Sequence, residues 1–373
     1  MKNQIYFFAN FGDWNKLPLG GGEVGNRKTL KLLKEMNLEV KLIPKYLHVP
    51  NHSILNIIRL GWRIVANILY YFTTLLFGRR NKSIVHIAGF YGTMIYFEYI
   101  LVFLAKFLRY RVIYEMRGGG ADFYYEKGNY LYKKCFSNVI NLCDTVFSQG
   151  IENKTLILKL SPNKNIFYYP NYVMDDFYPK KTPEKPTDRI NLIYFGRISK
   201  AKNIDIILST FYLLSDKYNN VYLDIVGDAE DNCLLDSLKE TVRNKGLYNK
   251  ICFHSACNND RLREHLKDKH FFIFPTQNNR EGHSNALTEA MSWGVIPITT
   301  KQGFNASVIG NDKFIVNELS AISFARIIEE IIDEDKISEF SATFYNRVIN
   351  NYTDKIILKK LDNEYQYLFK LFF

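Results

Sequence analysis

Two basic residues lie just after a short apolar run in the second half of the sequence. In YFGRISKAKNID the apolar run ends at Phe195, a glycine follows, and Arg197 and Lys202 precede a helical pattern. Cations at the carboxyl end of a strand, beside the amino terminus of a helix, form a site for a multiply charged anion such as a diphosphate. The alternative is a pair of solvated loop cations.

A second group of chemically active residues lies in PTQNNREGHSNALTEAMSWGVIPI. The polar loop leads through Glu281 into a helix that is predicted to start near Ser284 or Asn285. The amides of residues 284–287 are then unpaired donors suited to a phosphate, although Ser284 is also typical of a plain N-cap. Glu281 lies at the strand-end opening. Glu289, one turn inside the helix, is placed to accept hydrogen bonds from ribose hydroxyls.

A third candidate is the glycine run LGGGEVGNRKTL, which begins at Leu19 and has the GxGxxG spacing of dinucleotide-binding loops. The predicted strand before it ends about nine residues too early, and Lys45 follows the second strand where an acidic residue is expected. The context expected for a nicotinamide cofactor is therefore missing. Glycine still lets the backbone approach a ligand closely, so the run stays a candidate for another ligand.

Alternating strand and helix patterns position these residues. The chain has 373 residues, 47% of them hydrophobic, which is enough for two domains. The alternation predicts an α/β fold with two parallel sheets covered by helices, whose ligands bind beyond the carboxyl ends of the strands. The proline-rich run YPKKTPEKPTDR predicts a linker at 179–189, between domains 1–178 and 190–353, with a C-terminal helix at 354–373 packing back on the first domain. The strands are predicted near residues 4–11, 39–43, 84–89, 111–116, 145–148, 166–169, 191–196, 221–226, 251–254, 271–275 and 295–299.

The charge is divided unevenly between the two halves. Residues 1–190 hold 27 Lys and Arg against 14 Asp and Glu, whereas residues 191–373 hold 22 against 24, and no acidic residue lies between Val40 and Phe97. A basic half favours a surface that meets phosphates, but it carries no nucleic-acid recognition motif, so anionic lipid is the expected partner. Five cysteines without paired spacing and no recognisable secretion signal predict a cytoplasmic protein.

The run from Ser53 to Arg80 predicts a helix with a narrow polar stripe on a broadly apolar surface. Its apolar runs are shorter than the roughly 20 residues that span a bilayer. One interpretation is a helix that covers the first sheet. The interpretation we favour is a helix lying on an anionic membrane, helped by Trp62 and by the basic run GRRNK that follows.

These motifs together resemble those of the family-4 retaining glycosyltransferases, which belong to glycosyltransferase group 1 and have the GT-B fold. The likeness covers nearly the whole chain and is strongest in GRISKAKNID, LDIVGDAED and EGHSNALTEAMSWGVIPITT, where Glu281 and Glu289 match the family's E-x7-E motif. It extends to the glycine run and to YYPNYVMDDFYP. The resemblance implies two Rossmann-like domains facing a central cleft, with a sugar nucleotide held between them.

The resemblance also implies a role for each residue. Arg197 and Lys202 stabilise the donor diphosphate as a leaving group, Glu281 binds the donor sugar and acts with them in catalysis, and Glu289 binds the ribose. The other donor-binding residues implied are Gly20, Gly21, Gly22, Gly282, His283, Ser284, Asn285, Ala286 and Leu287. Arg117 stands where many relatives carry a histidine, and with Glu115 it is assigned to the acceptor side.

The function predicted is transfer of a sugar from a nucleotide donor, with a UDP-sugar as the expected donor, to a glycan acceptor, lipid-linked or oligosaccharide, in surface polysaccharide biosynthesis. The enzyme is predicted to be peripheral on the inner face of the cell membrane. No cofactor and no metal are expected, because the cations replace a metal, the acidic run 333–335 reads as a surface helix, and the histidines lack ligand spacing with cysteines. The alternatives are a GT-B-like sugar-nucleotide epimerase and a non-catalytic sugar-nucleotide-binding subunit of a membrane complex.

Overall fold

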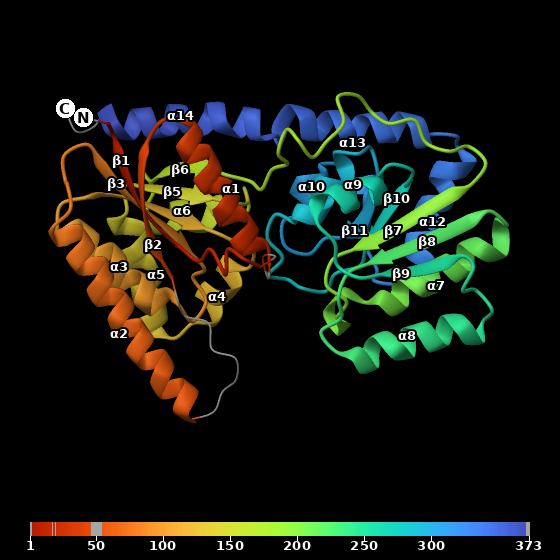
Figure 1. Ribbon diagram of the computed structural model, residues 1–373, viewed down its shortest axis with the longest axis horizontal. Coiled ribbons are helices and arrows are strands. Elements are labelled where there is room, and N and C mark those ends of the chain that lie inside the picture. The colour runs from red at the N-terminus through yellow and green to blue at the C-terminus, as the bar shows by residue number, and fades with distance from the viewer. Residues whose placement is uncertain (1, 17, 19, 46–53, 371–373) are drawn as a thin grey trace. The chain divides into compact units, whose positions relative to one another are not determined.

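The computed structural model describes residues 2–16, 18, 20–45 and 54–370 (Figure 1). The chain forms two compact units: unit 1 comprises Met1–Pro170 with Leu358–Phe373, and unit 2 comprises Asn171–Ile357. Leu19, Ser53 and residues 371–373, with which the glycine run and the apolar helix were predicted to begin and the last helix to end, lie outside the described residues.

Unit 1 contains a six-stranded parallel sheet in the order β2-β1-β3-β4-β5-β6. The residues of β1 and β3 are all buried, as expected for strands with helices on both faces of a parallel sheet. The strands are β1 Gln4–Ala9, β2 Glu39–Pro44, β3 Ser83–Gly89, β4 Arg111–Met116, β5 Thr145–Ser148 and β6 Asn165–Tyr168.

The helices of unit 1 connect successive strands, so each parallel pair is joined by a crossover. The helix α3 lies against α5 and α2, and side chains of all three pack onto the core of the sheet. The helices are α1 Gly21–Glu35, α2 Ile54–Leu76, α3 Ile95–Phe107, α4 Ala121–Lys127, α5 Tyr130–Leu142 and α6 Asn153–Leu160.

The helix α2 carries more apolar surface outside than inside. Its buried residues all come from Asn67 onward, while Ile58, Trp62 and Val65 in its first half are exposed. The polar stripe predicted for this helix includes Asn67 and Thr74, and both of these side chains are buried in unit 1. Figure 1 shows the amino end of α2 running past the sheet that the rest of the helix covers. No helix in the described part of the chain has the length and apolar character needed to cross a bilayer.

Unit 2 contains a second six-stranded parallel sheet, in the order β12-β11-β10-β7-β8-β9. Five of its strands match the predicted ones closely, and the sixth, β12, has only two residues and was not predicted. The strands are β7 Ile190–Phe195, β8 Val221–Val226, β9 Ile251–His254, β10 Phe271–Phe274, β11 Ile296–Thr300 and β12 Ile315–Val316.

A connecting loop and a helix follow each strand of this sheet. The amphipathic helix α12 lies against α7, and its apolar side is buried. The helices are α7 Ile204–Lys217, α8 Asn232–Asn244, α9 Asn259–Leu266, α10 Asn285–Met291, α11 Asn305–Ile309, α12 Ala321–Asp333 and α13 Ile337–Asn351, with two short 3-10 turns at Lys200–Lys202 and Asp312–Phe314.

The boundary between the units lies earlier than the linker predicted at 179–189. Residues 171–178 are bonded to unit 2, because the Asn171 side chain donates to the carbonyl of His283 and the Val173 amide donates to the carbonyl of Tyr352. Asp175 adds an ion pair with Lys355 at 2.8 Å. The stretch rich in proline is therefore a surface segment of unit 2 rather than a free connection.

The last helix, α14 Asp354–Lys370, begins in unit 2 and continues into unit 1. Leu361, Tyr365 and Leu368 are buried. The Tyr365 hydroxyl lies 2.6 Å from Nδ1 of His86, a residue of β3. Segments far apart in sequence thus complete one core in unit 1.

Candidate active site

Lys202 and Glu281 meet at the carboxyl ends of β7 and β10 in unit 2. Lys202 Nζ lies 2.7 Å from Glu281 Oε2, and the two side chains are only 19% and 16% exposed. The ammonium also lies 4.5 Å from the centre of the Phe274 ring, and the Thr276 hydroxyl donates to the same carboxylate oxygen at 3.3 Å. The structure therefore brings together two predicted residues that are 79 positions apart in sequence.

Glycines make this close arrangement possible, and sequence reasoning did not single them out. A Cβ on Gly303, which has φ +57°, would overlap the carbonyl of Glu281, and a Cβ on Gly227 would overlap the carbonyl of Gly196. Both positions have a positive φ, which disfavours other residues. The visible signal is a glycine directly after a strand in YFGR and IVGD, and shortly after one in TTKQGF.

Arg197 lies beside this pair in the chain but is held differently. Its guanidinium lies 2.9 Å from Glu230, and both side chains are more than half exposed. The Tyr194 hydroxyl donates to the Arg197 carbonyl at 2.7 Å, which fixes the backbone of the turn and leaves the side chain at the surface. Exposed pairs of this kind contribute little to stability, so the guanidinium can exchange Glu230 for another anion at small cost.

The helix after Glu281 starts at Asn285 and is short, with seven residues. Ser284 occupies the N-cap position, but its side chain makes no capping hydrogen bond. His283 is 2% exposed and its Nε2 lies 2.7 Å from the Thr288 hydroxyl, so the side chain supports the loop from within. Leu287 is buried as well, whereas Gly282, Asn285, Ala286 and Glu289 are partly exposed.

The two residues assigned to the acceptor side lie in a buried network of unit 1. Arg117 Nε donates to Glu115 at 2.7 Å, and Glu115 lies 3.1 Å from Nε2 of His86. Arg117 also donates to the Gly22 carbonyl and to the Thr29 hydroxyl of α1. Burial alone would raise the pKa of Glu115, but Arg117 and the His86 hydrogen bond outweigh it and the pKa is lowered.

This network explains part of the glycine run. A Cβ on Gly25 would overlap the Arg117 guanidinium, and a Cβ on Gly22 would press into the Phe90 ring. At Gly20, the N-cap of α1, nothing lies within 4 Å of an added Cβ. Packing within the unit therefore accounts for two of the three spaced glycines. Lys45, which follows β2, is buried in an ion pair with Glu98 at 3.3 Å. A lysine therefore stands where a dinucleotide-binding fold carries the acidic residue that binds the ribose.

Asp333 and Glu334 of the acidic run at 333–335 form ion pairs at the surface of unit 2. Asp333 bonds Lys217 at 2.9 Å, and Glu334 lies 3.1 Å from Lys313 and 3.0 Å from Lys336. These ion pairs fit the predicted surface position. Two histidines that the sequence did not connect, His254 and His265, instead lie close to Asp224.

A comparison with known protein families identifies the family that unit 2 matches. Residues 176–351 match the family model of glycosyl transferases group 1. Unit 2 is a group 1 glycosyltransferase domain. The family resemblance drawn from the motifs is confirmed by this match, and the predicted enzyme class, a glycosyltransferase that uses a nucleotide sugar, is the one that the match supports.

One curated relative is similar over part of its length. The chain is 26% identical over 230 residues to the capsular polysaccharide biosynthesis glycosyltransferase CapM of Staphylococcus aureus, covering 59% of this chain and 57% of that protein. The match thus spans a little over half of the relative.

Solved structures show the same fold over the whole chain. Sucrose-phosphate synthase from Thermosynechococcus elongatus superposes with a TM-score of 0.73 at 14% identity, covering 99% of this chain and 100% of that one. The Anabaena protein HepE in complex with UDP has a TM-score of 0.68 at 12% identity, over 98% and 99% of the two chains. The predicted α/β fold of the GT-B class is therefore confirmed.

Proposed function

We propose that the chain transfers a sugar, with retention, from a nucleoside diphosphate donor to a lipid-linked glycan acceptor at an anionic membrane surface. The observation that carries the donor part is the Lys202–Glu281 pair at 2.7 Å. An arriving diphosphate offers the ammonium a doubly charged partner, and the released carboxylate then accepts hydrogen bonds from sugar hydroxyls. The pair is thereby a preformed donor site whose members separate when the donor binds.

The cations supply the electrostatic part of catalysis. Negative charge develops on the diphosphate as the bond to the sugar breaks, and a fixed ammonium beside it lowers the barrier most where water is excluded. Lys202 is mostly buried, whereas Arg197 is exposed and adds charge from the rim. The donor we propose is a UDP-sugar, supported by the complex of the structural neighbour HepE with UDP.

The remaining site residues take more limited roles in this proposal. Backbone amides of Gly282, Ser284, Asn285, Ala286 and Leu287 face the donor, Glu289 binds the ribose, and His283 contributes its backbone because its side chain is buried. Gly20, Gly21 and Gly22, at the amino end of α1, are also proposed to bind the donor. Arg117 and Glu115 act as positioning residues, since their network holds the first turns of α1.

The acceptor part rests on α2. Trp62 is 71% exposed, and Ile54, Leu55, Ile57 and Ile58 add exposed apolar side chains on a helix that ends beside Arg79 and Arg80. Residues 76–81, which include Arg79 and Arg80, line a shallow and open depression there. Apolar area and adjacent cations together are what holds a helix on an anionic bilayer. The proposal includes the cytoplasmic membrane face and surface polysaccharide biosynthesis; this apolar surface supports the membrane part, and the similarity to CapM supports the biosynthetic part.

The test is a donor screen that measures nucleoside diphosphate release with and without extracted lipid acceptors. We expect release to depend on both a UDP-sugar and the lipid fraction, to persist in EDTA, and to give a product that keeps the donor's anomeric configuration. Epimerisation of the donor without an acceptor would establish the epimerase alternative. Donor binding without any turnover, under conditions where lipid is supplied, would establish the non-catalytic alternative.

A further inference from the structure

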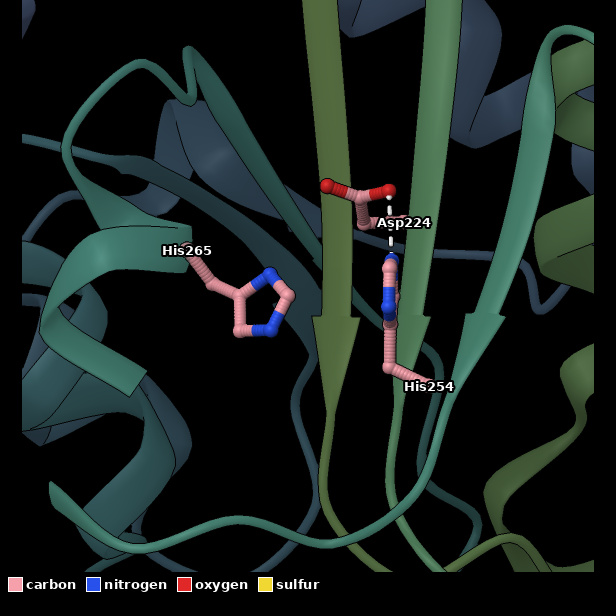
Figure 2. Close-up of side chains that lie close together, drawn as sticks. All are labelled: Asp224, His254 and His265. Atoms are coloured by element: carbon pink, nitrogen blue, oxygen red, sulfur yellow. Dashed lines mark hydrogen bonds and ion pairs between the residues drawn. The ribbon is translucent and has the colours of Figure 1, made fainter. Parts of the chain in front are cut away.

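A histidine pair and an aspartate from three elements of unit 2 converge outside the proposed donor site. Asp224 lies on β8, His254 is the last residue of β9, and His265 lies on α9. One ligand atom of each residue lies within 4.8 Å of those of the other two. Figure 2 shows the imidazole of His265 reaching from its helix toward the bonded pair of Asp224 and His254.

We propose that this cluster, the Asp224–His254–His265 triad, binds a zinc-class divalent transition-metal ion. Two imidazoles and one carboxylate are a donor set that zinc accepts, with bond lengths of about 2.0–2.2 Å and water in the fourth position. Magnesium and calcium prefer oxygen ligands and are disfavoured by two imidazoles.

The spacing within the triad suits such an ion. Two ligand atoms at tetrahedral angles around zinc are about 3.3 Å apart. Asp224 Oδ1 and His254 Nε2 are separated by 3.1 Å, so an ion can replace their hydrogen bond with little movement of either strand. The rings of His254 and His265 have centres 4.6 Å apart and are inclined at 56°. A rotation of the His265 side chain then brings one of its ring nitrogens to the ion.

Two cations, Lys269 and Arg261, lie near the triad and limit how tightly it binds a divalent ion. Lys269 holds Asp224 Oδ2 at 2.9 Å and Asp268 at 2.7 Å, which leaves Oδ1 for the ion. Arg261 on α9 adds a second positive charge that lowers the pKa of His265. These cations oppose a divalent ion, whereas Asp268 partly offsets them.

A bound ion would join α9 to the edge of the sheet. The strand β9 is the edge strand and pairs only with β8 among the described strands. The triad crosses from both strands to α9, so the ion stabilises an edge that is otherwise held on one side. The donor-site pair comes after β7 and β10, and metal binding here is independent of the cations proposed to replace a metal in turnover.

The test is equilibrium dialysis of the EDTA-treated and desalted protein against zinc, with bound metal measured by mass spectrometry. We expect one ion per chain, a rise in melting temperature on zinc addition, and a loss of affinity of about tenfold or more in His254→Ala, His265→Gln and Asp224→Asn. The cobalt-substituted protein should show tetrahedral visible bands without a thiolate charge-transfer band.

Cys252→Ala is the matched control. This cysteine is exposed and is the register partner of Asp224 on β9, but it is not part of the triad. The control variant should bind zinc as the parent does. Equal zinc binding by the parent and by His265→Gln, or loss of binding in Cys252→Ala alone, would overturn the proposal. Because His265 is partly exposed, an unchanged melting temperature of metal-free His265→Gln shows that the variant is folded.

Discussion

The two units each contain a close ion pair, but the two pairs differ in how far they are buried. Arg117–Glu115 in unit 1 and Lys202–Glu281 in unit 2 have the same nitrogen–oxygen distance of 2.7 Å. The first pair is 5% and 3% exposed and is tied to His86 and to α1, whereas the second is 19% and 16% exposed and stands at strand ends. The surface of unit 1 that we propose for binding is formed by exposed apolar side chains of α2 and not by an open ion pair.

This difference separates a positioning role from a binding role. An ion pair that is enclosed and has further hydrogen bonds cannot change partners without leaving a buried charge, which costs several kcal/mol. A pair at an opening can change partners when an anion arrives. Sequence motifs report the residue types in both cases, but only burial tells the two roles apart.

The largest expected effect is on the stability of unit 1. Glu115→Ala leaves the Arg117 guanidinium buried without its carboxylate, and we expect a loss of about 3–5 kcal/mol in the free energy of unfolding. Urea unfolding monitored by circular dichroism measures it. The control is Glu230→Ala, whose exposed pair with Arg197 should contribute about 1 kcal/mol or less. Similar losses in both variants would remove the distinction between enclosed and open pairs.

The next effect is on turnover and belongs to unit 2. Lys202→Ala and Glu281→Gln should each lower the turnover number about a hundredfold or more, because one preorganised electrostatic partner is worth about 3 kcal/mol. Arg189→Ala, which removes a surface ion pair with Asp188 in the same unit, is the control and should leave turnover unchanged. Nucleoside diphosphate release is the measurement. Near-parent rates in both site variants would place the donor elsewhere.

A smaller effect is expected on membrane binding through α2. Trp62→Glu removes exposed apolar area worth about 1.5–3 kcal/mol on burial, so binding to anionic vesicles should weaken about tenfold or more. Ile322→Glu on unit 2, where the side chain is 70% exposed, is the matched control and should bind as the parent does. Co-sedimentation at low and high salt measures both. If the parent protein does not sediment with anionic vesicles at low salt, the apolar face of unit 1 has another partner.

The smallest expected effect is on how the stability of the protein depends on pH in the acid range. The folded pKa of Glu115 is lowered, so its contribution is fully present above the unfolded value of about 4.3 and is lost as the pH falls through the folded pKa. Stability should therefore fall below about pH 4–5 with a steeper slope in the parent than in Glu115→Gln. Melting temperatures across the acid range measure the slopes. Parallel curves would mean that Glu115 is not ionised in its network.

The sequence predicted most of the sheet but only part of the site. Eleven strands were found because they are short and largely apolar runs, whereas a two-residue edge strand such as Ile315–Val316 leaves no pattern. The motifs identified Lys202 and Glu281 but not their contact, which depends on the order of the strands. The burial of Arg117 and the approach of His265 to Asp224 depend on how helices pack, and a search for cysteine spacing could not find the latter.

The course of α14 has a consequence for the order in which the protein forms during synthesis. Residues 171–357 are all present once Ile357 has left the ribosome, so unit 2 can fold before the residues from Leu358 onward have emerged. Unit 1 is translated first, yet Leu361, Tyr365 and Leu368 enter its core only later. The half that is made first is therefore completed last, and until then the core of unit 1 lacks these side chains and His86 lacks its hydrogen bond with Tyr365.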